Sequence, residues 1–130
     1  AKSKVEGDKK TPIGTFTLGN LLYRNDRHSR PLTKLKCFPI KKNMGWCDDI
    51  KSKKYYNKLI KINKNLRHEK LYRKDYKYDF LIPINYNTKN TKIGRGSGIF
   101  LHLTKKYNPT SGCIALQKKD FLILLKLINK

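Results

Sequence analysis

Acidic residues are scarce in this chain. Nine Asp and Glu residues stand against 31 Lys and Arg residues, which gives a formal net charge of +22 over 130 residues. Such a charge usually indicates nucleic acid or another anionic surface as the partner. Here lysine outnumbers arginine about fourfold, and the basic residues are spread along the whole chain. That spread favours a solvated lysine surface produced by A/T-rich coding over a dedicated polyanion site.

Long hydrophobic runs are absent too. The longest apolar run, Phe121 to Leu125, is far too short to span a bilayer, and no export signal is visible. The sequence begins at Ala1 without methionine, so we expect that a leader or a longer N-terminal part was removed. A chain of 130 residues with 38% hydrophobic residues is long enough to bury a core without disulfides. We therefore expect a single domain, residues 1–130.

Cysteine is rare and odd in number. With only Cys37, Cys47 and Cys113, at least one thiol stays outside any disulfide within the chain. Cys37 and Cys47 could pair in an oxidising compartment, but their sequence separation does not decide the geometry. No Cys-x-x-Cys or His/Cys cluster has the spacing of a zinc site, so we expect neither a metal nor a cofactor.

A histidine and the third of these cysteines lie close together in the sequence near the C-terminus. His102 is in an apolar run, and after a short polar loop the chain returns through Ser111 and Gly112 to Cys113. A thiol becomes a good nucleophile once an imidazole takes its proton, so the pattern predicts Cys113 as nucleophile and His102 as base. Gly112 would let the backbone approach a substrate, and Ser111 would orient the imidazole or hold the turn. A buried structural cysteine and a structural histidine are the alternative.

The remaining pattern is mostly that of short strands. Pro83 favours an edge position for its strand, and Asn43-Met44-Gly45 is expected to turn the chain. The last apolar segment has helical spacing with apolar residues on nearly every face, which indicates deep packing or, less favoured, a partner surface. The expected elements are extended segments at 15–23, 35–40, 80–84, 99–103 and 114–116, a covering loop with short helical or extended pieces at 51–66, and a helix at 118–129.

Two separate motifs resemble a known family. The block Gly7-Asp8-Lys9-Lys10-Thr11-Pro12-Ile13-Gly14, followed much later by His102 and Ser111-Gly112-Cys113, resembles the L,D-transpeptidase catalytic domain, or YkuD domain. Further motifs are similar to a proteobacterial branch of that family, so that the resemblance covers nearly the whole chain. Those motifs are Trp46-Cys47-Asp48-Asp49, His68-Glu69, Tyr78-Asp79, Tyr86-Asn87 and Gly94-Arg95-Gly96-Ser97.

The resemblance implies a mainly β fold, a YkuD-like β-sandwich with a C-terminal helix and a long insertion. It implies an L,D-transpeptidase that cross-links peptidoglycan stem peptides through an acyl group on Cys113, in the periplasm or cell wall, with a role in cell shape. Carbapenems would acylate the same sulfur. We expect a monomer without specific nucleic-acid binding; the positive surface could hold it near an anionic cell wall. An L,D-carboxypeptidase on the same scaffold and a basic nucleic-acid-binding module are the alternative functions.

The same resemblance and the local chemistry suggest a set of substrate-binding residues. Asp48 and Asp49 would cap a helix, pair with lysines, or receive a substrate amine. His68 and Glu69 would position a carboxylate or amine of the peptide, and a partnered structural histidine fits nearly as well. Many family members carry arginine where this chain has Ala115, so Arg73 or Arg95 would replace it. The full set is Trp46, Asp48, Asp49, His68, Glu69, Arg73, Tyr86, Asn87, Arg95 and Ser97; Trp46 fits a packing role better than a ligand platform.

Overall fold

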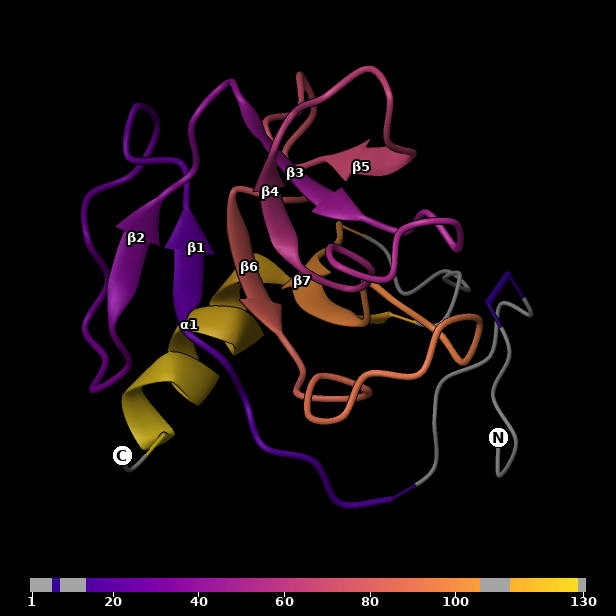
Figure 1. Ribbon diagram of the computed structural model, residues 1–130. Helices are drawn as coiled ribbons and strands as arrows, with labels where there is room; N and C mark the ends of the chain where they lie inside the picture. The colour runs from indigo at the N-terminus through magenta and orange to yellow at the C-terminus, as the bar shows by residue number, and fades with distance from the viewer. Residues whose placement is uncertain (1–5, 8–13, 106–112, 129–130) are drawn as a thin grey trace.

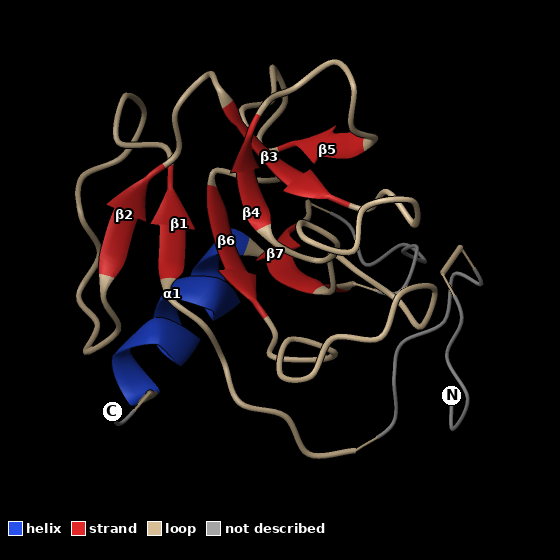
Figure 2. Cartoon of the chain, viewed as in Figure 1, coloured by secondary structure: helices blue, strands red, loops and turns tan. Residues whose placement is uncertain are grey.

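The computed structural model describes residues 6–7, 14–105 and 113–128, and its elements form two β-sheets and one C-terminal helix (Figures 1 and 2). A five-stranded sheet has the order β2-β1-β6-β7-β8, and a three-stranded sheet has the order β4-β3-β5. The prediction of a mainly β chain with a C-terminal helix is confirmed. The bounds are β1 (Leu21–Tyr23), β2 (Cys37–Pro39), β3 (Met44–Cys47), β4 (Leu59–Lys61), β5 (His68–Lys70), β6 (Phe80–Pro83), β7 (Phe100–Leu103), β8 (Ile114–Leu116) and α1 (Lys118–Leu127).

The larger sheet separates two hydrophobic cores. Its central strands β6 and β7 are buried at every position, because both of their faces are covered. On one face, Leu101 and Leu103 of β7 pack with Phe121 and Leu125 of α1. On the other face, Phe100 packs in a second core with residues that include Trp46, Leu71, Tyr78 and Leu81. Strand β3 of the smaller sheet brings Trp46 into this second core.

The edge position expected for Pro83 is wrong. Strand β6 lies between β1 and β7 in the five-stranded sheet. Pro83 is tolerated there because β1 pairs only with Phe80 and Leu81, so the missing proline N–H lies past the end of that ladder. On that side the Pro83 carbonyl accepts a hydrogen bond from the Gly19 N–H at 2.7 Å.

The turn expected at Asn43-Met44-Gly45 lies slightly earlier, at Lys42 and Asn43, where the Met44 N–H donates to the Lys41 carbonyl at 3.1 Å. Met44 and Gly45, which were expected in the turn, already begin strand β3. Gly45 lies between β4 and β5, opposite Ile60 and Lys70. A Cβ atom at this position would approach the His68 ring to 3.1 Å. The glycine therefore permits close packing of a strand and does not mark a chain reversal.

The three cysteines form no disulfide in the structure. Cys37 is half-buried on β2 of the larger sheet, and Cys47 is fully buried on β3 of the smaller sheet. The two thiols whose pairing the sequence left open thus lie on different sheets.

Candidate active site

Strands β7 and β8 present His102 and Cys113 on the same face of the larger sheet. The strands are parallel, with Leu101 opposite Ile114 and His102 opposite Ala115. Because side chains alternate along a strand, Cys113 shares the face of Ala115 and therefore that of His102. His102 and Cys113 are then diagonal neighbours on this face of the parallel pair.

The imidazole of His102 is held in one tautomer. Its Nδ1 lies 2.9 Å from the carbonyl oxygen of Leu103, and a carbonyl only accepts, so Nδ1 carries the proton. In the neutral ring, Nε2 is then the acceptor. The side chain is buried, and burial lowers the pKa of His102 below its usual 6.5. A neutral imidazole with an acceptor nitrogen is the form that a general base requires.

The sulfur of Cys113 lies at the start of β8, against the beginning of β7. Its S–H donates to the Gly98 carbonyl at 3.3 Å, and the Phe100 N–H donates to the sulfur at 3.4 Å. Gly98 has a φ of +59°, a left-handed conformation that a glycine adopts without strain. One backbone acceptor and one backbone donor at the beginning of β7 therefore hold the sulfur in place.

Tyr78 connects this face to strand β5. Its ring packs edge-on against both His102, at 5.4 Å between ring centroids, and Phe100, at 5.7 Å. Its hydroxyl donates to a carboxylate oxygen of Glu69. Burial raises the pKa of Tyr78 and also that of Glu69. The sequence indicates Tyr78 only as part of the Tyr78-Asp79 motif, because a tyrosine in a polar stretch gives no sign of its buried partners.

Asn57 is a second residue that the sequence did not single out. It is 4% exposed, and its Oδ1 accepts from the Trp46 Nε1–H at 2.8 Å and from the Gly98 N–H at 3.0 Å. Its Nδ2 donates to the backbone carbonyls of Tyr86 and Asn87. Asn57 therefore fixes the smaller sheet to the glycine-rich segment that carries Gly98. Trp46, with its indole committed to Asn57 and its ring against Phe100, is a packing residue.

Four of the expected substrate-binding residues shape the glycine-rich segment 94–98 or lie in it. Tyr86 donates its hydroxyl to the Arg95 carbonyl at 2.7 Å. Asn87 donates to the carbonyls of Lys92 and Gly96. The Ser97 hydroxyl donates to Glu6 at 2.5 Å, whereas the Arg95 side chain is exposed.

The charged residues around β3 and β5 fall into two groups. Arg73 is held by Asp75 through two hydrogen bonds, and Asp49 accepts from the backbone N–H groups of Lys51 and Arg67. Those side chains are already paired within the fold. His68 similarly donates its Nδ1–H to the Leu66 carbonyl.

Asp48 and Glu69 form the other group. Asp48 Oδ1 is buried without a hydrogen-bond partner and lies 3.6 Å from Arg67 Nε. Burial raises the pKa of both carboxyl groups, and each is further raised by neighbouring negative charge, which for Glu69 is that of Asp48. A cation bound beside these two carboxyl groups would stabilise their charged forms.

Ser111, Gly112 and residues 8–13 of the N-terminal block lie outside the described residues.

A comparison with protein families decides the identity. The model of the YkuD family, the L,D-transpeptidase catalytic domain, matches residues 2–130. The chain belongs to the YkuD family. Searches among curated proteins and among solved structures gave no match.

Membership of the YkuD family defines the class of chemistry. YkuD domains are cysteine-dependent enzymes of the transpeptidase type that act on peptidoglycan stem peptides and are typically associated with the cell wall. A β-sandwich with a single C-terminal helix is consistent with this family. Within the described part of the chain, no helix has the length and hydropathy that crossing a membrane requires.

Proposed function

We propose that this protein is an L,D-transpeptidase that cross-links peptidoglycan stem peptides through an acyl-enzyme on Cys113. The observation that carries the proposal is the arrangement of His102 and Cys113 as diagonal neighbours on one sheet face, with the His102 Nδ1–H bound to the Leu103 carbonyl. We propose the periplasm or cell wall as its location and a monomer as its working form.

The first half of the reaction forms a thioester. His102 Nε2 takes the thiol proton, and the sulfur attacks the carbonyl carbon of the residue that precedes the terminal D-residue of a stem peptide. A C–S bond forms, the amide C–N bond breaks, and the proton passes from His102 to the leaving amine. The Phe100 N–H, which donates to the sulfur, supports the thiolate before attack.

The second half transfers the acyl group to an acceptor amine. The amine attacks the thioester carbonyl, a new amide bond forms, and the sulfur leaves and regains its proton through His102. Asp48 and Glu69 support binding of an acceptor that carries an ammonium group, because a cation relieves the cost of two neighbouring half-buried carboxyl groups. Deprotonation of that ammonium then supplies the nucleophile.

The test is the mass of the intact protein after incubation with a carbapenem and, separately, with a stem tetrapeptide. We expect wild type to gain one carbapenem and to give cross-linked dimers when an acceptor strand is present. Cys113→Ala should lose both, and Cys37→Ala, which removes a half-buried thiol of β2, should keep both. Full cross-linking by Cys113→Ala would refute the proposal.

The same experiment separates the alternative functions. An L,D-carboxypeptidase would release the terminal D-residue at the same rate with and without acceptor and would form no dimer. A nucleic-acid-binding module would bind DNA or RNA in a salt-sensitive manner that Cys113→Ala leaves unchanged.

A further inference from the structure

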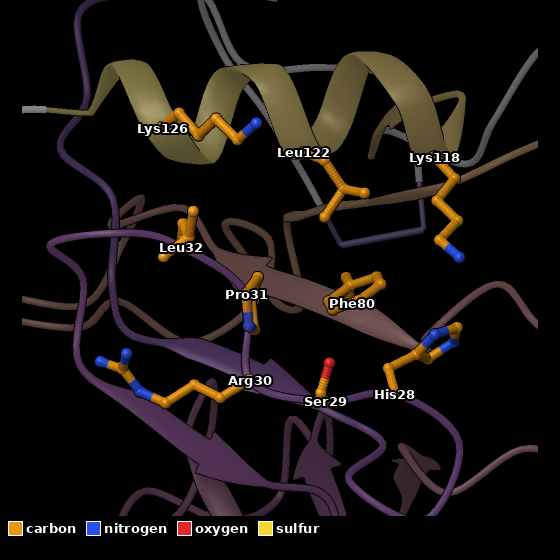
Figure 3. Close-up of a pocket in the computed structure, with 9 residues that line it drawn as sticks. All are labelled: His28, Ser29, Arg30, Pro31, Leu32, Phe80, Lys118, Leu122 and Lys126. Atoms are coloured by element: carbon orange, nitrogen blue, oxygen red, sulfur yellow. The ribbon is translucent and has the colours of Figure 1, made fainter.

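A groove of about 320 Å³ lies between helix α1 and the segment 28–32 (Figure 3). Its floor and walls include Pro31, Leu32, Phe80 and Leu122, which are apolar. The helix turns one row of side chains toward this groove, at positions four residues apart. The row is Lys118, Leu122 and Lys126 (Figure 3).

Cationic groups surround the apolar floor. Lys118 and Lys126 come from the helix, and Arg30 comes from the opposite side. Within the part of the chain that the structure describes, no acidic side chain forms an ion pair with Lys118, Lys126 or Arg30. These charges are therefore available to an anionic ligand.

Large apolar side chains of the segment 28–32 and of helix α1 are exposed to solvent. Leu32 and Leu127 are each 74% exposed, and Ile123 is 47% exposed. Lys119, Ile123 and Leu127 make the next row round the helix, again four residues apart. Exposed leucines in a chain of such high charge are costly to leave in water. Apolar side chains interleaved with lysines on one helix face are typical of a segment that lies on a membrane surface.

We propose that α1 and the segment 28–32 dock on an anionic lipid bilayer. Lysine and arginine around the groove bind lipid phosphates, and Leu32, Ile123 and Leu127 enter the boundary between head groups and acyl chains. A soluble polyanion would satisfy the cations but leave the three apolar side chains in water. A bilayer satisfies both sets, which is why it is the occupant that this surface fits.

The groove lies on the helix side of the five-stranded sheet, whereas His102 and Cys113 lie on the opposite side. Docking through α1 would thus leave the catalytic face directed away from the lipid. The proposal is independent of which acceptor the enzyme uses.

The experiment is co-sedimentation with vesicles of phosphatidylglycerol and phosphatidylcholine, compared with vesicles of phosphatidylcholine alone. We expect binding to the anionic vesicles that weakens as salt is added. Lys118→Glu/Lys126→Glu should weaken it by about tenfold or more, because each lysine near an anionic surface contributes about a fivefold factor. Leu32→Ser/Leu127→Ser should weaken it too, and should leave the residual binding easier to remove with salt.

A matched control carries the same charge change on the smaller sheet's side of the molecule. Lys53→Glu/Lys64→Glu alters two exposed lysines outside the groove and should keep most of the binding. All variants should be acylated by a carbapenem at the wild-type rate, which shows that they are folded.

Three results would overturn the proposal. In the first, the two lysine pairs affect vesicle binding equally, so that net charge alone is responsible. In the second, wild type binds a soluble polyanion but no vesicle. In the third, wild type sediments as a dimer in analytical ultracentrifugation and Leu32→Ser/Leu127→Ser makes it a monomer, which would assign the face to a second copy of the chain.

Discussion

Single side chains in the second core serve packing and chemistry together. Tyr78 packs its ring against His102 and donates its hydroxyl to Glu69 in the same buried space. The ring restricts how the imidazole can rotate, and the Leu103 carbonyl fixes its tautomer. A change at Tyr78 should therefore alter stability and catalysis through the same contacts.

Tyr78→Phe keeps the ring and removes the hydroxyl. We expect the free energy of unfolding to fall by about 1–3 kcal/mol, because the buried Glu69 carboxyl loses its donor. Urea denaturation followed by tryptophan fluorescence measures this loss. Tyr55→Phe is the matched control, since the Tyr55 hydroxyl is on an exposed side chain, and it should change stability by less than about 0.5 kcal/mol. Equal effects of the two substitutions would contradict a structural role for the Tyr78 hydroxyl.

The pH dependence of acylation should follow His102. Burial lowers the pKa of His102, so the base stays neutral, and active, below pH 6.5. We expect the rate of acylation by a carbapenem to fall on the acid side with a midpoint below pH 6.5. Mass spectrometry of samples quenched at successive times measures this rate. As the pH falls through 6.5, the unfolded chain binds a proton that the native His102 does not, so this residue also lowers stability in acid. A midpoint above 6.5 would indicate that His102 is stabilised in its charged form.

At the scale of elements, the two sheets are joined by a side chain in an irregular segment. Asn57 follows strand β3, precedes strand β4, and bonds to three separate segments: Trp46 on β3, Gly98 before β7, and the 86–87 turn. Its φ is +58°, in the left-handed region that asparagine tolerates better than most residues. The segment 94–98, which contains Gly98 and leads into β7, is thus positioned by a residue outside any strand.

Asn57→Ala should destabilise the protein by about 2–4 kcal/mol, because several buried donors and acceptors lose their partners at once. The acylation rate should fall as well, since Gly98 is no longer held beside Cys113. Thermal unfolding and carbapenem acylation measure the two effects. Asn90→Ala is a control for the backbone alone: Asn90 also has a left-handed φ, of +52°, but is exposed. A loss no greater than that of Asn90→Ala would mean that the conformation, and not the hydrogen bonds, matters at Asn57.

How far the sequence predicts these elements depends on how local each signal is. Apolar runs such as Phe80–Pro83 and Phe100–Leu103 are visible in the sequence because central strands are buried on both faces. The beginning of strand β3 was missed because Gly45 suggests a turn. A glycine is needed at this position because the His68 ring lies close to it, and His68 is 23 residues away in the chain. Asn57 gave no signal, since an asparagine among lysines looks like any solvated residue.

Some residues of the candidate site can also be predicted from the sequence, whereas the contacts of others cannot. His102 and Cys113 stand out because rare residue types occur within or next to apolar runs, and their assigned roles stay a prediction that the acylation test decides. Arg73 and Arg95 were the two candidates to replace the family arginine at the position of Ala115, and the guanidinium of Arg73 is held by Asp75. Pairing between side chains two residues apart in a loop depends on the local backbone path, which composition does not specify.

Over the whole molecule, the dominant physical fact is the net charge of +22. Like charges on a compact surface repel each other and destabilise the folded state. Exposed lysines lie in strands β4 and β5, in helix α1 and in most of the loops between the strands, so the repulsion is distributed and not confined to one site.

Salt should therefore stabilise the protein. Raising the sodium chloride concentration from about 0.01 M to about 0.15 M shortens the screening length from roughly 30 Å to roughly 8 Å. We expect the urea midpoint to rise over this range. Lys53→Glu/Lys64→Glu lowers the net charge by four, from +22 to +18, and should show a smaller rise. An unchanged midpoint in wild type would mean that surface repulsion does not limit stability.

The pairing of β7 with β8 also limits how the chain can change in length. Strand β8 has three residues and lies at the end of its sheet, where no strand among the described residues pairs with its outer side to correct its alignment. One residue inserted directly after Cys113 would rotate the sulfur to the helix side of the sheet if the strand kept its pairing. Natural insertions and deletions should accumulate between Lys105 and Cys113, and the join from Cys113 to Ile114 should keep a constant length.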